Sequence, residues 1–154
     1  MADNYLEKKM ELYRAKACGG DGAKGKSNLL SLLDKCVSEP SFDDYVVRED
    51  QLCRIALAAT KTSSVFSYNL LTRSQVAELL LPAADSACVL VCAPAEGLDF
   101  VLLGRVVQVM ALQAAEVGLC AVFAAGADLS PFSSVVPEGF SPVALVRVGR
   151  PLKV

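Results

Sequence analysis

The sequence predicts one α+β domain in three layers, in which a mixed sheet of about four strands is flanked by helices. Two observations support this class. Apolar runs of strand length, such as ACVLVCA at 87–93, alternate with longer segments in which apolar residues recur at helical spacing. A length of 154 residues suits a single core. We divide the chain into an N-terminal helical arm with a Gly/Lys linker, residues 1–27, and the domain proper, residues 28–154.

Three helices are expected in the N-terminal half. The first, at 4–17, carries an apolar face that begins at Leu6. The second, at 27–35, has Ser27 as its N-cap. Its buried side is expected to consist of the leucines at 29, 30, 32 and 33. The third, at 48–61, is expected to bury one apolar face, made of Leu52, Ile55, Ala56 and Ala59.

The stretch GDGAKGKS at 20–27 fits the pattern G-x-x-x-x-G-K-[ST] of a nucleotide phosphate loop, with Lys26 and Ser27 as the ligands. Such a loop follows a buried strand, whereas a charged helix precedes this one. We therefore interpret the stretch as a flexible linker that ends in a helix N-cap.

Strands and helices alternate in the C-terminal half. A strand at 66–72 is followed by a helix at 73–81, which a capping box of Thr72 and Gln75 opens. The apolar run at 87–93 predicts a buried central strand. A loop with two prolines precedes the final strand, SPVALVRVG.

Residues 99–125 predict a long helix that ends at Gly118 and passes directly into a strand. The helix is apolar nearly all round, and a helix of this kind is buried on every side. Since a chain of 154 residues offers little to cover it, we expect a homodimer whose subunits share this helix and together form the binding crevice.

Composition excludes several classes of function. A net charge of −2 offers no basic surface for nucleic acid. The chain has no histidine, which rules out Ser-His-Asp and Cys-His nucleophiles and His-ligated zinc. The longest apolar stretch, 100–127, is interrupted by Arg105 and Glu116 and predicts no membrane span. Six cysteines without C-x-x-C spacing are typical of reduced packing residues in a cytoplasm, so we predict no metal site.

The chain resembles the nitroreductase family of FMN-dependent oxidoreductases over roughly residues 36–151. LLGRVVQVMALQAAEVGL at 102–119 is similar to the central dimer helix of that family. CAVFAAGADLS at 120–130 and VPEGFSPVALVRVGRP at 136–151 resemble the strands that follow it, and VVREDQLCRIALAATKTSS at 46–64 resembles the helix that leads into the flavin loop.

The resemblance implies a flavin site, but the chain departs from the family there. A stretch Arg-Ser-x-Arg-x-Phe usually binds the FMN phosphate, and residues 37–42 keep only Ser38 and Phe42 of it. Two arginines are therefore missing, each of which would contribute charge-assisted hydrogen bonds of roughly 1.5–3 kcal/mol. By the resemblance, Arg150 and Lys153, just past the final strand, would partly compensate.

Three further residues are implied for the same cofactor. Ser64 and Ser67 lie in the segment that matches the family's flavin loop, which lacks its asparagine here, and Gly126 would let the backbone approach the flavin ring. For each serine the alternative is capping or loop hydrogen bonding, for Gly126 a tight turn, and for Arg150 and Lys153 solvated charges of the tail. No side chain is assigned a catalytic role, because the flavin would carry the reaction.

Two functions remain open. The first is an FMN-dependent oxidoreductase that passes electrons from NADH or NADPH to a nitroaromatic or quinone-like acceptor, as the resemblance implies. The alternative is a dimeric binding or scaffold protein that keeps the fold and has lost flavin and activity.

Overall fold

The computed structural model describes residues 29–36, 41–80, 85–124 and 126–152. The expected arm, with its helix at 4–17 and the linker at 20–27, lies outside them. Within them four strands form one sheet: β1 Ser67–Leu71, β2 Ala87–Pro94, β3 Cys120–Phe123 and β4 Phe140–Gly149. The helices are α2 Leu29–Lys35, α3 Glu49–Thr62, α4 Arg73–Leu80, α5 Phe100–Glu116 and the short 3-10 helix η1 Ser130–Val135.

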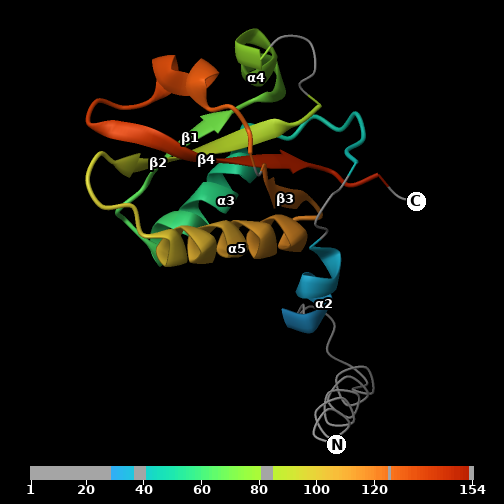
Figure 1. Cartoon of the computed structure of the whole chain (residues 1–154). Helices are drawn as coiled ribbons and strands as arrows, with labels where there is room; N and C mark the ends of the chain where they lie inside the picture. Colours follow the sequence, from blue (N-terminus) through green and yellow to red (C-terminus); the bar gives the residue numbers. More distant parts are fainter. Residues whose placement is uncertain (1–28, 37–40, 81–84, 125, 153–154) are drawn as a thin grey trace, which may run out of the picture.

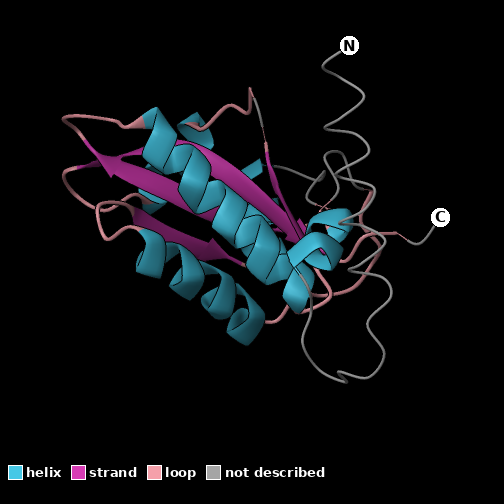
Figure 2. Ribbon diagram, turned by 90° about the horizontal axis from the view of Figure 1, so that it is seen from below, coloured by secondary structure: helices cyan, strands magenta, loops and turns pink. Residues whose placement is uncertain are grey.

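The sheet lies between two layers of helices, as Figure 1 shows. Helices α3 and α5 cover one face, and in Figure 2, seen from that side, they lie over the sheet and run roughly along its strands. Helix α4 and η1 cover the other face. The α+β class, the three layers and the four strands are therefore confirmed among the described residues.

The expectation of a mixed sheet is wrong, because every neighbouring pair of strands is antiparallel. The strand order is β1-β2-β4-β3, with β2 and β3 both antiparallel to β4. After helix α5 the chain enters β3, which runs in the same direction as β2. The two strands are not neighbours, because a space one strand wide separates them. Strand β4 fills this gap in the opposite direction, so the two parallel strands never pair.

Strand β2 is the buried centre that its apolar run predicts. Its residues from Ala87 to Ala93 are all buried. Because side chains alternate between the faces of a strand, Val89 and Val91 pack with α3 and α5, whereas Cys88 and Leu90 pack with α4 and η1. One apolar run therefore supplies both halves of the core.

Helix α5 is buried on one side only within the single chain. Five residues of α5 are buried, and this side of the helix packs on α3 and the sheet: Leu103, Val106, Met110, Ala114 and Ala115. On the opposite side Val101 is 76% exposed and Gln108 is also exposed. The expectation of burial on every side is thus not met by the described residues of one chain.

Of the local predictions, the cap of α4 is confirmed and the burial of Leu33 is wrong. The capping box of α4 is confirmed, since Thr72 N–H donates to Gln75 Oε1 at 2.9 Å and Gln75 N–H donates to Thr72 Oγ1 at 3.4 Å. Leu33 of α2 is exposed rather than buried, and the main contact of this short helix among the described elements is with α5. No helix among the described residues has the length and apolar character needed to cross a membrane.

Candidate functional site

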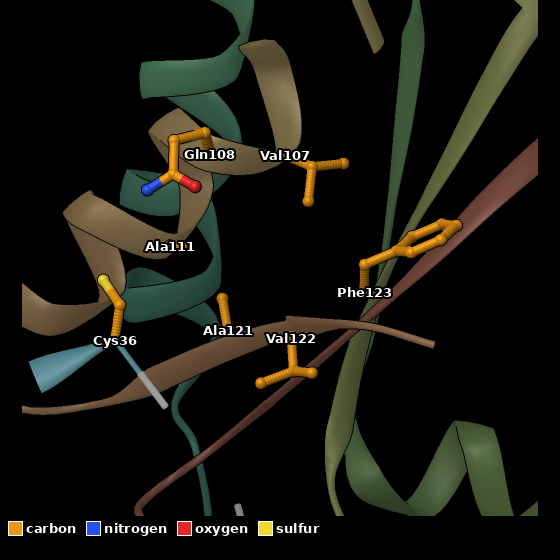
Figure 3. A pocket seen from close by; sticks show the side chains of 7 residues that line it. All are labelled: Cys36, Val107, Gln108, Ala111, Ala121, Val122 and Phe123. Atoms are coloured by element: carbon orange, nitrogen blue, oxygen red, sulfur yellow. The ribbon is translucent and has the colours of Figure 1, made fainter. Parts of the chain in front are cut away.

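A recess of about 310 Å³ opens between α5 and the edge strand β3 (Figure 3). Seven residues line it: Cys36, Val107, Gln108, Ala111, Ala121, Val122 and Phe123. The volume of the recess and its largely apolar lining match small-molecule sites, which are mostly apolar and enclose roughly 300–1,000 Å³. The recess is therefore the candidate binding site of the described chain.

The walls of the recess follow from the sequence of the two elements that form it. Ala111 and Ala121 are small, so α5 and β3 leave space between them. Phe123, 44% exposed, closes one end, and Cys36, just past α2, closes the other. Gln108 is the only lining side chain with an amide, and it is exposed. An apolar slot with one amide suits an aromatic ligand that also carries carbonyl or imide groups.

A basic residue stands close to the Cys36 end of the recess. Ala121 of β3 pairs with Val148 of β4, and Arg150 lies two positions further on. Two positions along a strand correspond to about 7 Å. The backbone of Arg150 thus lies one strand and two positions away from Ala121, while Arg150 itself is not among the residues that line the recess.

The backbone around Arg150 is fixed by the segment that precedes α3. Leu152 N–H donates to the Ser41 carbonyl at 2.8 Å, and Asp43 N–H donates to the Arg150 carbonyl at 3.0 Å. Phe42 and Pro151 form an isolated antiparallel bridge between these two bonds. Segments 107 positions apart therefore meet beside the recess.

The Arg150 side chain is held by two neighbours. Its Nε donates to Asp43 Oδ2 at 2.5 Å, and its guanidinium lies 4.6 Å from the centre of the Tyr45 ring. Asp43 Oδ1 also accepts from Tyr45 N–H at 2.8 Å. These hydrogen bonds, Tyr45 N–H first and Arg150 second, lower the pKa of Asp43 from its usual value.

Arg147, the other arginine near this end of β4, is also paired. Its Nη2 donates to both carboxylate oxygens of Asp85, at 2.8 and 2.6 Å, and its guanidinium lies 5.1 Å from the centre of the Phe42 ring. Both arginines at this end of the sheet are therefore already partnered with a carboxylate.

Ser64 and Ser67 lie elsewhere. Ser67 begins β1, at the edge of the sheet opposite to β3, and it pairs with Cys92 near the end of β2. The loop that holds Ser64 is fixed by Tyr68, whose hydroxyl donates to the Ser63 carbonyl at 3.2 Å and whose pKa is raised to about 12 by burial. In one chain, the two serines are not brought together with the recess.

The remaining predicted site residues are partly described. Gly126 follows β3 beyond Phe123, with φ of +70°, a conformation that favours glycine. It therefore lies past the Phe123 end of the recess. Ser38 and Lys153 lie outside the described residues.

Sequence reasoning missed Asp43, Tyr45 and Cys36. No short motif marks them. The bridge between Phe42 and Pro151 and its two flanking backbone hydrogen bonds place Asp43 and Tyr45, whereas Cys36 is placed by the end of α2. The sole available signal was the aspartate pair that directly follows Phe42, a position that the resemblance had already singled out.

The comparisons with solved structures show the fold. A nitroreductase-like family protein from Bacillus cereus matches with a TM-score of 0.67 at 14% identity, over 86% of this chain and 90% of that one. A nitroreductase family protein from Clostridium difficile 630 matches with a TM-score of 0.66 at 20% identity, over 83% and 87%. An oxidoreductase containing FMN matches with a TM-score of 0.62 at 17% identity, over 86% and 80%.

At these identities the comparisons establish a nitroreductase-like fold and nothing finer. No family model and no curated protein matches the sequence. The structural resemblance that the sequence implied is thus confirmed at the level of the fold.

Proposed function

We propose that this chain is a flavin-dependent oxidoreductase that passes electrons from NADH or NADPH to a nitroaromatic or quinone-like acceptor. The observation that carries the proposal is the apolar recess between α5 and β3, in a fold similar to that of a solved oxidoreductase containing FMN. A bound flavin would supply the redox chemistry, so the chain needs no catalytic acid or base of its own.

The recess fits the flavin ring in its chemistry. Val107, Ala111 and Phe123 offer apolar contact to an aromatic system. The amide of Gln108 both donates and accepts hydrogen bonds, as the polar edge of such a ring requires. These side chains would bind and orient the ring and exclude water from one of its sides.

The two arginines near the end of β4 fit the phosphate of FMN poorly. A phosphate dianion is bound most strongly by cations whose charge no carboxylate already balances. Arg150 and Arg147 are instead hydrogen-bonded to Asp43 and Asp85. The chain thus supports the ring of the cofactor better than its charged end.

We further propose that two copies of the chain complete the site. Ser64 and Ser67 lie toward the edge of the sheet opposite to the recess, so they contribute only if a partner brings its own β1 edge beside it. The exposed side of α5, which includes Val101 and Gln108, is the surface through which we expect the copies to meet.

Flavin titration tests the proposed function directly. The purified chain is mixed with riboflavin or FMN, and quenching of flavin fluorescence and the visible flavin band are followed. Saturable binding, followed by bleaching of the band on adding NADH or NADPH without oxygen, is the expected result. If neither flavin binds at micromolar concentrations, the proposed oxidoreductase function is wrong.

The second candidate is a flavin-free binding or scaffold protein with the same fold. The ion pair between Asp43 and Arg150 favours this second candidate, because Arg150, the cation expected to bind the phosphate, is already paired with a carboxylate. The same titration separates the two, since only the oxidoreductase requires a flavin in the recess.

A further inference from the structure

The Asp43 carboxylate is built into the fold rather than loosely placed near Arg150. Its two oxygens accept from different donors, Oδ1 from Tyr45 N–H at 2.8 Å and Oδ2 from Arg150 Nε at 2.5 Å. Its side chain is 24% exposed, half the exposure of the Arg150 side chain at 50%. The backbone hydrogen bonds of Asp43 and Ser41 fix this arrangement further.

A phosphate that approached Arg150 would meet this carboxylate. It would have to bind the remaining N–H groups of a guanidinium whose Nε already donates to Asp43, and it would lie within a few ångströms of that negative charge. A hydroxyl group faces no such conflict, because it can donate to a carboxylate. The site therefore opposes a dianion and accepts a neutral polyol.

We propose that the site takes a flavin without its phosphate, of the riboflavin type, because Asp43 occupies the position at Arg150 that a phosphate would need. This inference rests on the proposed function. It changes the cofactor class from the phosphorylated flavin to its neutral dephosphorylated form, whose hydroxyls are suitable donors for the Asp43 carboxylate.

The test compares the dissociation constants of riboflavin and FMN for the full chain at low ionic strength, by fluorescence quenching. For the unmodified chain we expect riboflavin to bind at least as tightly as FMN. For Asp43→Asn we expect FMN to gain about tenfold over riboflavin, since repulsion between close charges is relieved. Asparagine keeps an oxygen that can accept from Tyr45 N–H, so the turn is preserved.

Asp50→Asn is the matched control. Asp50 is likewise an aspartate paired with an arginine, Arg48, at 2.9 Å, but it is exposed, lies in the first turn of α3 and does not line the recess or contact Arg150. It should leave the ratio of the two constants unchanged. Circular dichroism of both variants establishes that they are folded.

The possible outcomes are distinct. A clear preference of the unmodified chain for FMN, or an unchanged ratio in Asp43→Asn, would overturn this inference and leave the flavin-dependent function standing. Failure of both flavins to bind would overturn both proposals. Preference for riboflavin that Asp43→Asn reverses, and Asp50→Asn does not, would establish it.

Discussion

Phe42 packs directly against the backbone of Gly149. A Cβ atom added to Gly149 would lie 2.5 Å from Phe42 Cδ1 and 2.6 Å from Cγ, closer than real Cβ contacts. Gly149 ends β4, and Phe42 belongs to the segment that carries Asp43. Because Gly149 has no side chain, the Phe42 ring can pack against it, and this contact holds the segment that brings Asp43 to Arg150.

Gly149→Ala tests this contact. The ring would have to shift and the bridge between Phe42 and Pro151 would loosen, so we expect the free energy of unfolding to fall by roughly 1–3 kcal/mol, as for overpacked sites. Urea denaturation followed by circular dichroism measures the loss.

A double-mutant cycle separates the clash from other effects of the alanine. In the background of Phe42→Ala the ring is absent, so adding Gly149→Ala should cost much less than it does in the unmodified chain. Equal costs in both backgrounds would show that the ring contact does not require the glycine.

The N-cap of α5 gives a second prediction. Asp99 Oδ1 accepts from Val101 N–H at 2.9 Å and from Leu102 N–H at 3.1 Å. Asp99→Ala leaves these donors without a side-chain partner and is expected to lower the free energy of unfolding by about 1 kcal/mol. Glu96→Ala, three residues earlier and exposed, should change it by less than about 0.5 kcal/mol. Similar losses in the two variants would argue against a specific cap.

Much of the fold was predictable because its signals are local. The apolar run of β2, the helical spacing of α3 and the capping box of Thr72 and Gln75 each depend on a few neighbouring residues. The direction of strand pairing was not predictable, because it depends on where β4 inserts, and that is decided by packing over the whole sheet.

The candidate site was predictable only in part. Arg150 was found by its place after the final strand, as the resemblance implied. Its partner Asp43 was not, because the pairing joins segments 107 positions apart and the bridge between Phe42 and Pro151 leaves no periodic trace in the sequence. The recess was missed because it depends on small residues, Ala111 and Ala121, whose effect is visible only when α5 and β3 are placed together.

The cysteines give a prediction about pH. Burial raises the pKa of Cys88 to about 12 and that of Cys92 to about 11. A thiol in the unfolded chain titrates near pH 8.5. Above this pH the unfolded chain loses the thiol protons while the buried thiols keep them, so the contribution of the two cysteines to the free energy of unfolding is complete below about pH 8.5 and falls as the pH rises toward the pKa values of the folded chain. We expect the denaturation midpoint to fall between about pH 8.5 and pH 11. Replacing both residues by alanine should flatten this fall, and an unchanged slope would contradict the assignment.

Thiol labelling checks the same cysteines independently. In a Cys18→Ser background, Cys53 is exposed and should react first with iodoacetamide at pH 8. Cys36 is half-buried and its pKa is raised, chiefly by burial, so it should follow more slowly. The three buried thiols, Cys88, Cys92 and Cys120, should react only in denaturant, and rapid labelling of any of them in the folded chain would contradict the packing described above.

The exposed side of α5 supplies the last prediction, which concerns the proposed homodimer. Val101 is 76% exposed in the single chain, so Val101→Glu should leave the folded subunit nearly unchanged, within about 0.5 kcal/mol. At a dimer interface the same carboxylate would be buried without a partner, and the complex should dissociate. Light scattering is expected to give a dimer for the unmodified chain and a monomer for the variant.

The control for this surface is Val46→Glu. Val46 is 66% exposed but precedes α3 and is not part of α5, so this variant should remain dimeric. If Ser64 and Ser67 of one copy do complete the recess of the other, Val101→Glu should also weaken flavin binding, whereas Val46→Glu should not. A monomeric unmodified chain that binds flavin normally would show that one copy suffices, and it would leave the exposed apolar residues of α5 without the role proposed for them.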